Sequence, residues 1–219
     1  MTVHRTLFIG DLEAQYRICR NELELSLLPA VSDVISLGNL VSCSDLAADD
    51  VELGRNEAVL TFWDRISIPK TRLIGRNEIA ALNFPRQWTN NLSNNFLRDG
   101  WLSEEPTFVV ATVNKGRLVT SAGLTHGLWQ EIGRPETAEE AAKILNEMYF
   151  QTMYQGPSFL IEGKPNLSAN PIWADAVLEL YPSWILAEDK CPFDQIHGAD
   201  SLNSKRARAM IAEEDHPLH

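Results

Sequence analysis

Three stretches in the first third of the chain, Phe8-Ile9-Gly10-Asp11, Val34-Ile35-Ser36-Leu37-Gly38-Asn39 and Leu73-Ile74-Gly75-Arg76, share one pattern. In each, a short and mainly apolar run ends in glycine followed by a polar residue. Such a run is typical of a buried strand that ends in a tight turn. We therefore predict strands over 6–9, 34–37 and 72–74, each with a polar residue at its carboxyl end.

Helical patterns occupy the spaces between these three strands. They run approximately over 13–28 and 53–66. Strand, helix, strand, helix and strand in alternation indicate a parallel α/β arrangement. The first half of the chain is therefore predicted to form a parallel sheet with helical crossovers.

The second half has a different pattern. Residues 107–113 and 117–120 are rich in β-forming residues and are separated by Asn114-Lys115-Gly116, which predicts a hairpin. A last core strand is predicted over 195–198. A helix is predicted from Pro135 through Met148, with Thr137 as N-cap and Glu140 three residues later.

A further short helix is predicted over 171–180. We find no internal repeat, low-complexity segment or linker in the sequence. The chain is therefore expected to form a single domain over residues 1–219.

Composition excludes several classes of partner. The 219 residues are 44% hydrophobic and carry a formal net charge of −11, with a pI near 4.9. This charge disfavours nucleic acid as a partner, and the densest basic run, Lys205 to Arg208, is expected to cap or follow a helix. No apolar run is long enough for a membrane span, and no signal peptide is recognisable. Three cysteines without a short spacing suggest reduced thiols, so we expect a cytoplasmic protein.

Five segments together resemble the calcineurin-like metallophosphoesterases, whose motifs are GDxH, GDxxDRG, GNHE, a lone His after a strand, and GHxH. In chain order they are Phe8–Glu13, Leu37–Ser42 with its continuation Cys43-Ser44, Leu73–Glu78, Leu118–Gly123 and Gln195–Ser201. The resemblance covers nearly the whole chain. It implies an α/β fold of the metallophosphoesterase type, a sandwich of two mixed β-sheets flanked by helices.

The same resemblance implies that most metal ligands have been replaced. Of seven family ligand positions only Asp11 keeps its residue type, and all four ligand imidazoles are gone. Glu13, Ser121, Ala199 and Ser201 stand where the family has histidine, and Asn39 stands where it has the bridging aspartate. In the third motif Arg76 replaces the ligand asparagine, Asn77 replaces the histidine that would protonate the leaving group, and Glu78 is retained.

Arg76 allows two interpretations. It can form a structural salt bridge with Asp11 and Glu13, at the place where the family has positively charged metal ions, and we favour this interpretation. Alternatively, it can bind the phosphate of a ligand directly. His126, in the segment Ser121 to Trp129, could line the same cleft, although a satisfied and partly buried loop histidine is the more common case. His197 is expected to be structural.

These substitutions favour a non-catalytic protein that acts as a binding or scaffold protein with a protein partner and no metal cofactor. One alternative is a hydrolase with a remodelled site, which would use Asp11, Glu13, Asn39 and Glu78 around a single divalent metal (Mn, Fe or Zn), with His126 nearby as acid or base. Another is a metal-free binder of a nucleotide or another phosphorylated small molecule through Arg76.

Overall fold

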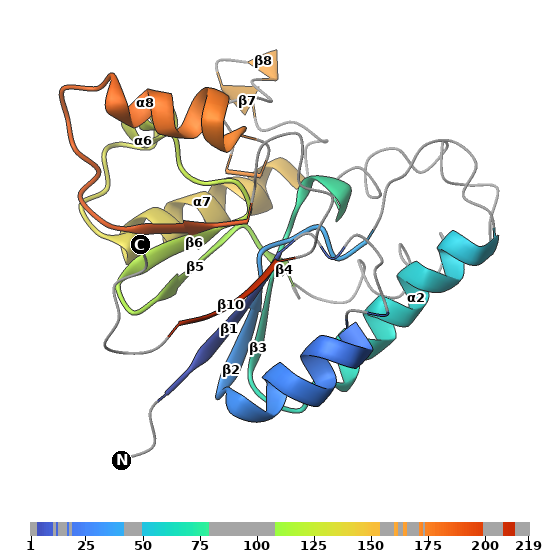
Figure 1. Ribbon diagram of the computed structural model, residues 1–219. Helices are drawn as coiled ribbons and strands as arrows, with labels where there is room; N and C mark the ends of the chain where they lie inside the picture. The colour runs from blue at the N-terminus through green and yellow to red at the C-terminus, as the bar shows by residue number, and fades with distance from the viewer. Residues whose placement is uncertain are drawn as a thin grey trace. The chain divides into compact units, whose positions relative to one another are not determined.

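The structure is a computed structural model that describes residues 4–10, 12, 17, 19–41, 50–78, 108–153, 160–161, 164–165, 171–172, 174–198 and 208–212 (Figure 1). Two compact units are present. Unit 1 comprises Met1–Arg72, Arg76–Thr107 and Lys205–His219, and unit 2 comprises Leu73–Gly75 and Phe108–Ser204. The single domain expected over residues 1–219 stays a prediction.

Unit 1 is built on a mixed sheet. Its strands lie in the order β10 (Arg208–Ala212), β1 (Thr6–Gly10), β2 (Asp33–Ser36) and β3 (Lys70–Leu73). β1 pairs in parallel with β2, and β2 pairs in parallel with β3, whereas β10 is antiparallel to β1. All five residues of β1 are buried, as expected for a strand with neighbours on both sides. The three predicted strands are confirmed to within one or two residues.

β10 was not predicted. Arg208, the last residue of the basic run that was expected to cap or follow a helix, is instead the first residue of this strand and pairs with Gly10, while residues 205–207 lie outside the described residues. The pairing joins residues about two hundred positions apart, and a local pattern gives no sign of such a partner.

Helices follow β1 and β2 in unit 1. They are η1 (Cys19–Leu27), a π-helix, the short 3₁₀ helix η2 (Leu28–Ala30), and α2 (Asp50–Arg65). Figure 1 shows η1 and α2 beside one another, covering one face of the sheet. The predicted helices over 13–28 and 53–66 are confirmed where described, and 13–16 lie outside the described residues.

The end of α2 is fixed by Lys70, the first residue of β3. Its Nζ donates to the carbonyl oxygens of Trp63 (2.9 Å), Asp64 (2.8 Å) and Ile66 (3.2 Å). Carbonyls at a helix C-terminus lack the regular i+4 amide partners, although the Trp63 carbonyl also accepts from the Ile66 N–H (3.1 Å), and a cation there is favoured by the helix dipole. The contact sets where the helix stops and where the third strand begins.

Unit 2 is built on a second mixed sheet. Its order is β5 (Ala111–Asn114), β6 (Arg117–Thr120) and β9 (Gln195–His197), with β5 antiparallel and β9 parallel to β6. The hairpin turn has positive φ at both Lys115 (53°) and Gly116 (74°), as a type I′ turn requires. The predicted hairpin and last core strand are confirmed.

The predicted strand over 107–113 is interrupted at Val110, between β4 (Phe108–Val109) and β5. Asn146 of α7 (Ala138–Met153) fills the break. Its Oδ1 accepts from the N–H groups of Val110 (2.8 Å) and Ala111 (3.1 Å), and its Nδ2 donates to the Ala111 carbonyl (2.8 Å). Backbone groups without a strand partner are thus satisfied by a helix side chain.

The start of α7 follows the predicted capping pattern. Thr137 Oγ1 accepts from the Glu140 N–H (3.2 Å), while the Glu140 carboxylate accepts from the Glu136 N–H (3.1 Å). The Glu140 bond thus reaches one residue before the N-cap and not the N-cap itself. α7 contacts β5 and β6.

Three further described helices of unit 2 are α6 (His126–Glu131), the π-helix η4 (Ala176–Leu180) and α8 (Tyr181–Ile185). Two short strands, β7 (Leu160–Ile161) and β8 (Lys164–Pro165), form an antiparallel pair. The helix expected over 171–180 begins later, at Ala176, because Asp175 caps it with bonds from the Val177 and Leu178 N–H groups (2.9 and 2.8 Å).

The fold is therefore mixed α/β, with one mixed sheet in each unit. Across the described ranges no helix is long and apolar enough to cross a membrane.

Asn146→Ala should lower the free energy of unfolding by about 1–3 kcal/mol, because it leaves partly buried backbone groups at the strand break without partners. The matched control is Lys143→Ala on the same helix. The Lys143–Glu147 pair (3.9 Å) is largely exposed, so its loss should cost less than about 0.5 kcal/mol. Urea denaturation followed by circular dichroism measures both, and equal effects of the two substitutions would contradict the role given to Asn146.

Candidate functional site

The polar residue after β2 lies in an unusual turn. Gly38 and Asn39 both have positive φ (90° and 54°), and the Gly38 N–H donates to Ser36 Oγ (3.2 Å). Asparagine tolerates this left-handed conformation better than most residues with a side chain. Asn39 is buried, so the turn directs the residue at the bridging-ligand position into the protein.

Glu78 holds this turn from the segment that follows β3. Its carboxylate accepts from the Asn39 N–H (2.9 Å, Oε2) and from the Val41 N–H (3.2 Å, Oε1). The residue is 1% exposed. Backbone donors directed at an ionised carboxylate make strong hydrogen bonds, so both oxygens of Glu78 serve to fix the backbone of the neighbouring loop.

Asn77 adds a second pair of bonds between the same two segments. Its N–H donates to Asn39 Oδ1 (3.1 Å), and its Nδ2 donates to the Val41 carbonyl (2.8 Å). The side-chain oxygen of Asn39 therefore accepts a hydrogen bond from the backbone of the segment after β3. We call these four hydrogen bonds from Asn77 and Glu78 to Asn39 and Val41 the loop clamp.

The loop clamp changes the interpretation of the third motif. Glu78 and Asn77 both hydrogen-bond to the segment after β2, a structural use that their positions in the motif did not indicate. Arg76, by contrast, is exposed beside these two buried neighbours. Its expected partners Asp11 and Glu13 lie outside the described residues, so the salt bridge with Arg76 stays a prediction.

In unit 2, the loops of the fourth and fifth motifs meet. The Gly198 N–H donates to the Ser121 carbonyl (2.9 Å), just beyond the parallel pair β6 and β9. Ser121 is buried. The structure therefore brings these two motif loops together, while Ala199 and Ser201 lie outside the described residues.

Gly123 is the point of closest packing in this loop. It has a φ of 91°, and its N–H donates to Thr120 Oγ1 (2.8 Å). A Cβ at this position would collide with the side chain of Leu180, which is buried. Helix η4 therefore packs directly against the backbone of the fourth-motif loop.

His126 is the first residue of α6 and lies in an aromatic cluster. Its imidazole contacts the rings of Trp129 (5.6 Å between centroids) and Trp184 (5.1 Å, edge to face). Asp189 lies 3.5 Å from its Nε2 and 4.0 Å from Arg134, whose guanidinium lies 5.6 Å from the Trp129 ring centre. The described contacts of His126 thus lie within a packed cluster of unit 2.

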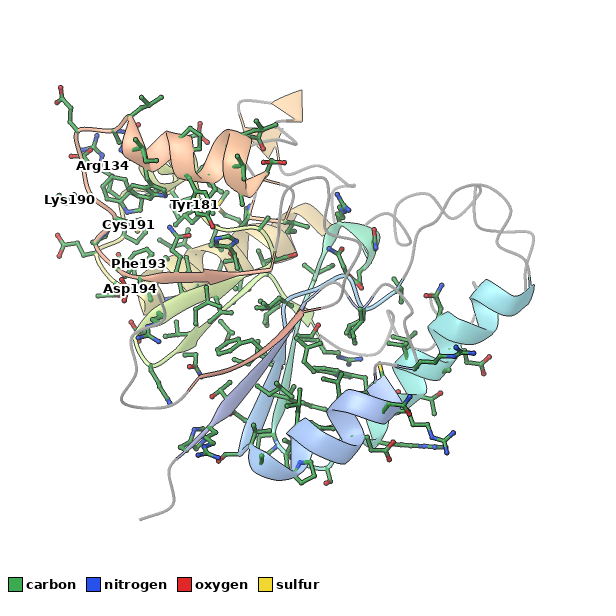
Figure 2. All side chains as sticks on the ribbon, in the orientation of Figure 1. Arg134, Tyr181, Lys190, Cys191, Phe193 and Asp194 are labelled. Atoms are coloured by element: carbon green, nitrogen blue, oxygen red, sulfur yellow. The ribbon has the colours of Figure 1, made fainter. Side chains whose placement is uncertain are left out.

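His197 is half-buried in β9. Its Nε2 lies 3.2 Å from the Tyr181 hydroxyl, and Figure 2 shows Tyr181 between α8 and β9. Within the part of the chain that is described, no group of three His, Cys, Asp or Glu side chains is placed to hold a metal ion.

The two described cysteines, Cys19 and Cys191, are free thiols. Burial raises the pKa of the Cys19 thiol to about 12, so this thiol stays protonated near neutral pH. Cys191 is half-buried, and its thiol donates to the Phe193 carbonyl (3.0 Å). Cys43 lies outside the described residues.

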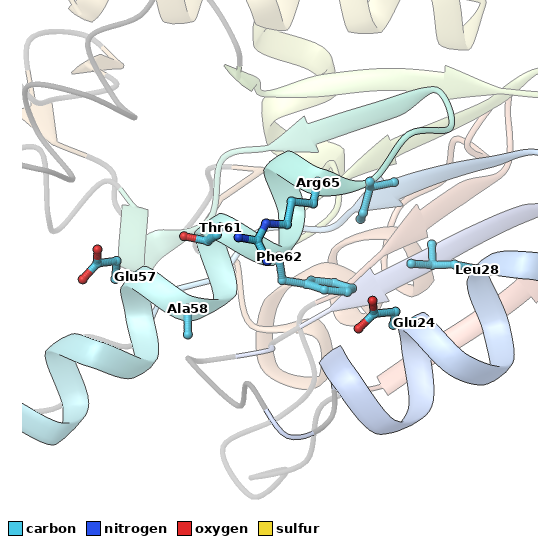
Figure 3. A pocket seen from close by; sticks show the side chains of 8 residues that line it. Glu24, Leu28, Glu57, Ala58, Thr61, Phe62 and Arg65 are labelled. Carbon is cyan, nitrogen blue, oxygen red and sulfur yellow. The ribbon is translucent and has the colours of Figure 1, made fainter.

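A pocket of about 370 Å³ lies between η1 and α2 in unit 1 (Figure 3). Phe62 and Ile66 give it an apolar floor, and Glu24, Glu57 and Arg65 are exposed at its rim. None of the residues predicted from the five motifs lines this pocket.

Comparisons with known proteins give little further information. No protein-family model matches the chain, and no curated protein matches it significantly. Among solved structures it is similar to a cold-active protein-tyrosine phosphatase from a psychrophilic Shewanella species, with a TM-score of 0.45 and 12% identity. The match covers 85% of this chain but only 59% of the phosphatase chain. A likeness of this degree assigns neither a family nor an activity.

Glu78→Gln should lower the free energy of unfolding by about 1–3 kcal/mol, because the new amide nitrogen must face one of the two backbone N–H donors. Arg76→Ala, at the exposed neighbour, should cost less than about 1 kcal/mol. Glu131→Gln is the matched control, since it makes the same chemical change at an exposed position. Urea melts of the three variants measure the differences. A loss for Arg76→Ala as large as that for Glu78→Gln would show that the cation, and not the clamp, dominates this site.

Gly123→Ala should destabilise unit 2 by about 1–3 kcal/mol, through left-handed strain and collision with Leu180. The control is Gly127→Ala, where a Cβ meets nothing within 4 Å and φ is not positive, so a gain of about 0.4–1 kcal/mol is expected. Adding Leu180→Ala should relieve the collision but not the strain. Additive effects of Gly123→Ala and Leu180→Ala in a double-mutant cycle would therefore rule the collision out.

Proposed function

We propose that this protein is a non-catalytic relative of the calcineurin-like metallophosphoesterases that works by binding, as a scaffold for a protein partner. The observation that carries the proposal is the loop clamp. Residues at the ligand positions of the second motif and the catalytic positions of the third hydrogen-bond to one another, and Asn39 Oδ1 is occupied by the Asn77 N–H.

The chemistry of the substituted positions supports the same proposal. Two-metal phosphoester hydrolysis needs anionic and imidazole ligands that hold two cations and lower the pKa of a bound water. Asn39 is neutral, Ser121 has a weakly coordinating hydroxyl, and Arg76 adds a permanent positive charge. An unmetallated site can keep its fold because the clamp replaces metal–ligand bonds with backbone hydrogen bonds.

The proposed relationship also includes the sandwich arrangement of the family. Its support is that each unit carries a mixed sheet, that the loops after β2 and β3 meet, and that the loops after β6 and β9 meet. The free thiols Cys19 and Cys191 support the proposed cytoplasmic setting, where disulfides are rare.

A second candidate is a metal-free binder of phosphorylated small molecules. The observation in its favour is that Arg76, three residues after the buried end of β3, is exposed. Arginine recognises phosphate through paired N–H donors. The single-metal hydrolase requires Asp11 and Glu13 with Asn39, and no described contact favours it over the other two.

The test combines metal content, turnover and phosphate binding on the full chain. The protein, purified after growth with Mn, Fe or Zn, should contain no stoichiometric metal by elemental analysis. It should hydrolyse p-nitrophenyl phosphate and bis-p-nitrophenyl phosphate at background rates. Asn39→Asp restores one anionic ligand and should still bind no metal, because the imidazoles remain absent.

The alternatives predict different results in the same experiment. Stoichiometric metal with turnover that is lost in Asp11→Ala would establish the hydrolase instead. Binding of inorganic phosphate or AMP by calorimetry, lost in Arg76→Ala and kept in Arg65→Ala, would establish the phosphate binder.

A further inference from the structure

The pocket between η1 and α2 has the size of a small-molecule site. Its volume of about 370 Å³ falls within the range of roughly 300–1,000 Å³ that is usual for ligand pockets. On each helix the lining residues recur four positions apart, so they follow the side that borders the pocket. They are Ala58, Phe62 and Ile66 with Glu57, Thr61 and Arg65 on α2, and Glu24 with Leu28 on η1. The five motifs and the loop clamp do not use any of these residues.

The floor of this pocket is apolar. Phe62 and Ile66 are each 8% exposed, and Leu28 and Ala58 are half-buried beside them. Figure 3 shows the Phe62 ring directed from α2 toward η1. Ala58 lies about one turn before Phe62, and its short side chain leaves room there that a longer one would fill. An aromatic or branched aliphatic group would bury apolar surface on this floor.

Three charged side chains lie at the rim of the pocket. Glu24, Glu57 and Arg65 are exposed, and within the described part of the chain their side chains form no ion pair or hydrogen bond. Other cations of unit 1 are engaged, since Lys70 donates to helix carbonyls and Arg72 lies 3.9 Å from Asp64. The charges of the pocket are therefore available to a ligand.

The positions of these charges indicate which ligand would fit. Glu24 and Arg65 line the pocket from different helices, and Figure 3 shows the Phe62 ring between them. They do not reach each other as an ion pair, so a ligand that carries both charges would bridge them. Glu57 lies eight residues before Arg65, about 12 Å along the helix, which is too far for the two charges of one short ligand. An anion alone would face two carboxylates, and a cation alone would lie beside a guanidinium.

We propose that this pocket binds a small zwitterion with an apolar side chain, the chemical class of a free amino acid whose side chain is aromatic or branched. Arg65 would bind its carboxylate through paired N–H donors, and Glu24 would accept from its ammonium group. The apolar side chain would pack on Phe62 and Ile66. The inference goes beyond the proposed scaffold role and does not rest on it, so metal content, turnover and phosphate binding do not decide it.

Ligand-observed NMR titrations of the full chain with L-phenylalanine and L-leucine test the proposal. Because the charged rim is exposed, we expect a Kd on the order of 1 mM or tighter. Phenethylamine lacks the carboxylate and 3-phenylpropionate lacks the ammonium group, so each should bind at least about fivefold more weakly than phenylalanine. No saturable binding of either amino acid, or equal affinity for the three phenyl compounds, would overturn the proposal.

Charge variants assign each contact. Arg65→Gln should weaken phenylalanine binding about fivefold without weakening phenethylamine, whereas Glu24→Gln should weaken both without weakening 3-phenylpropionate. Lys143→Gln and Glu131→Gln remove the same charges at exposed positions of unit 2 and should leave all affinities unchanged. Equal weakening by the controls would mean that the ligand senses only net charge and would overturn the proposal.

A further variant tests the cavity without changing any charge. Ala58→Leu extends a side chain into the pocket at a helix position that suits leucine, and it should weaken phenylalanine binding about tenfold or more. Circular dichroism and urea melts show whether the variant keeps its fold. Leu28→Ala, which removes an apolar contact on η1, should also weaken binding and serves if Ala58→Leu does not fold. Unchanged phenylalanine binding in the folded variant would place the ligand elsewhere and overturn the proposal.

Discussion

The carboxylate of Glu78 is the interaction on which the candidate site depends. It lies in a buried position and holds two backbone N–H groups of the loop after β2, which itself turns through left-handed conformations at Gly38 and Asn39. Backbone donors in such a turn have no strand partner and must be satisfied locally. The Glu78 side chain, from the segment after β3, accepts hydrogen bonds from two of these donors. It thereby joins the segments that follow the carboxyl ends of the parallel strands β2 and β3.

If the proposed relationship to the metallophosphoesterases holds, the clamp would keep the segments after β2 and β3 in shape without a metal. Metal ions crosslink loops at strand ends, and removing them would leave anionic groups close together. Here Asn39 carries no charge, and its amide oxygen accepts the Asn77 N–H. The buried carboxylate of Glu78 accepts hydrogen bonds from two backbone N–H groups, which stabilise its charge.

In unit 2 the indole N–H groups have hydrogen-bond partners, whereas several large apolar side chains are exposed. Its polar groups are well used, since each of the two indole N–H groups of the cluster around His126 has a carbonyl acceptor, Pro135 for Trp129 and Leu124 for Trp184. Its large apolar groups are arranged unevenly on one helical segment, since Val177, Leu178, Tyr181, Ile185 and Leu186 are exposed, whereas Leu180 is buried and packs against Gly123.

The sequence by itself determined the features that local interactions control. The strands before Gly10, Gly38 and Gly75, the type I′ turn at Lys115-Gly116 and the Thr137 cap follow from periodicity and from backbone preferences within a few residues. Tertiary structure alone decided the rest. β10 pairs with β1, although the two strands lie near opposite ends of the sequence. The Asn146 side chain accepts a hydrogen bond from the backbone at Val110, more than thirty residues earlier in the sequence. Asn77 and Glu78 hydrogen-bond to the loop after β2. The helical segment of residues 176–186 has one buried and one exposed apolar face. Local patterns specify which residues form an element, but which face is covered and which donor meets which acceptor depends on segments distant in the chain.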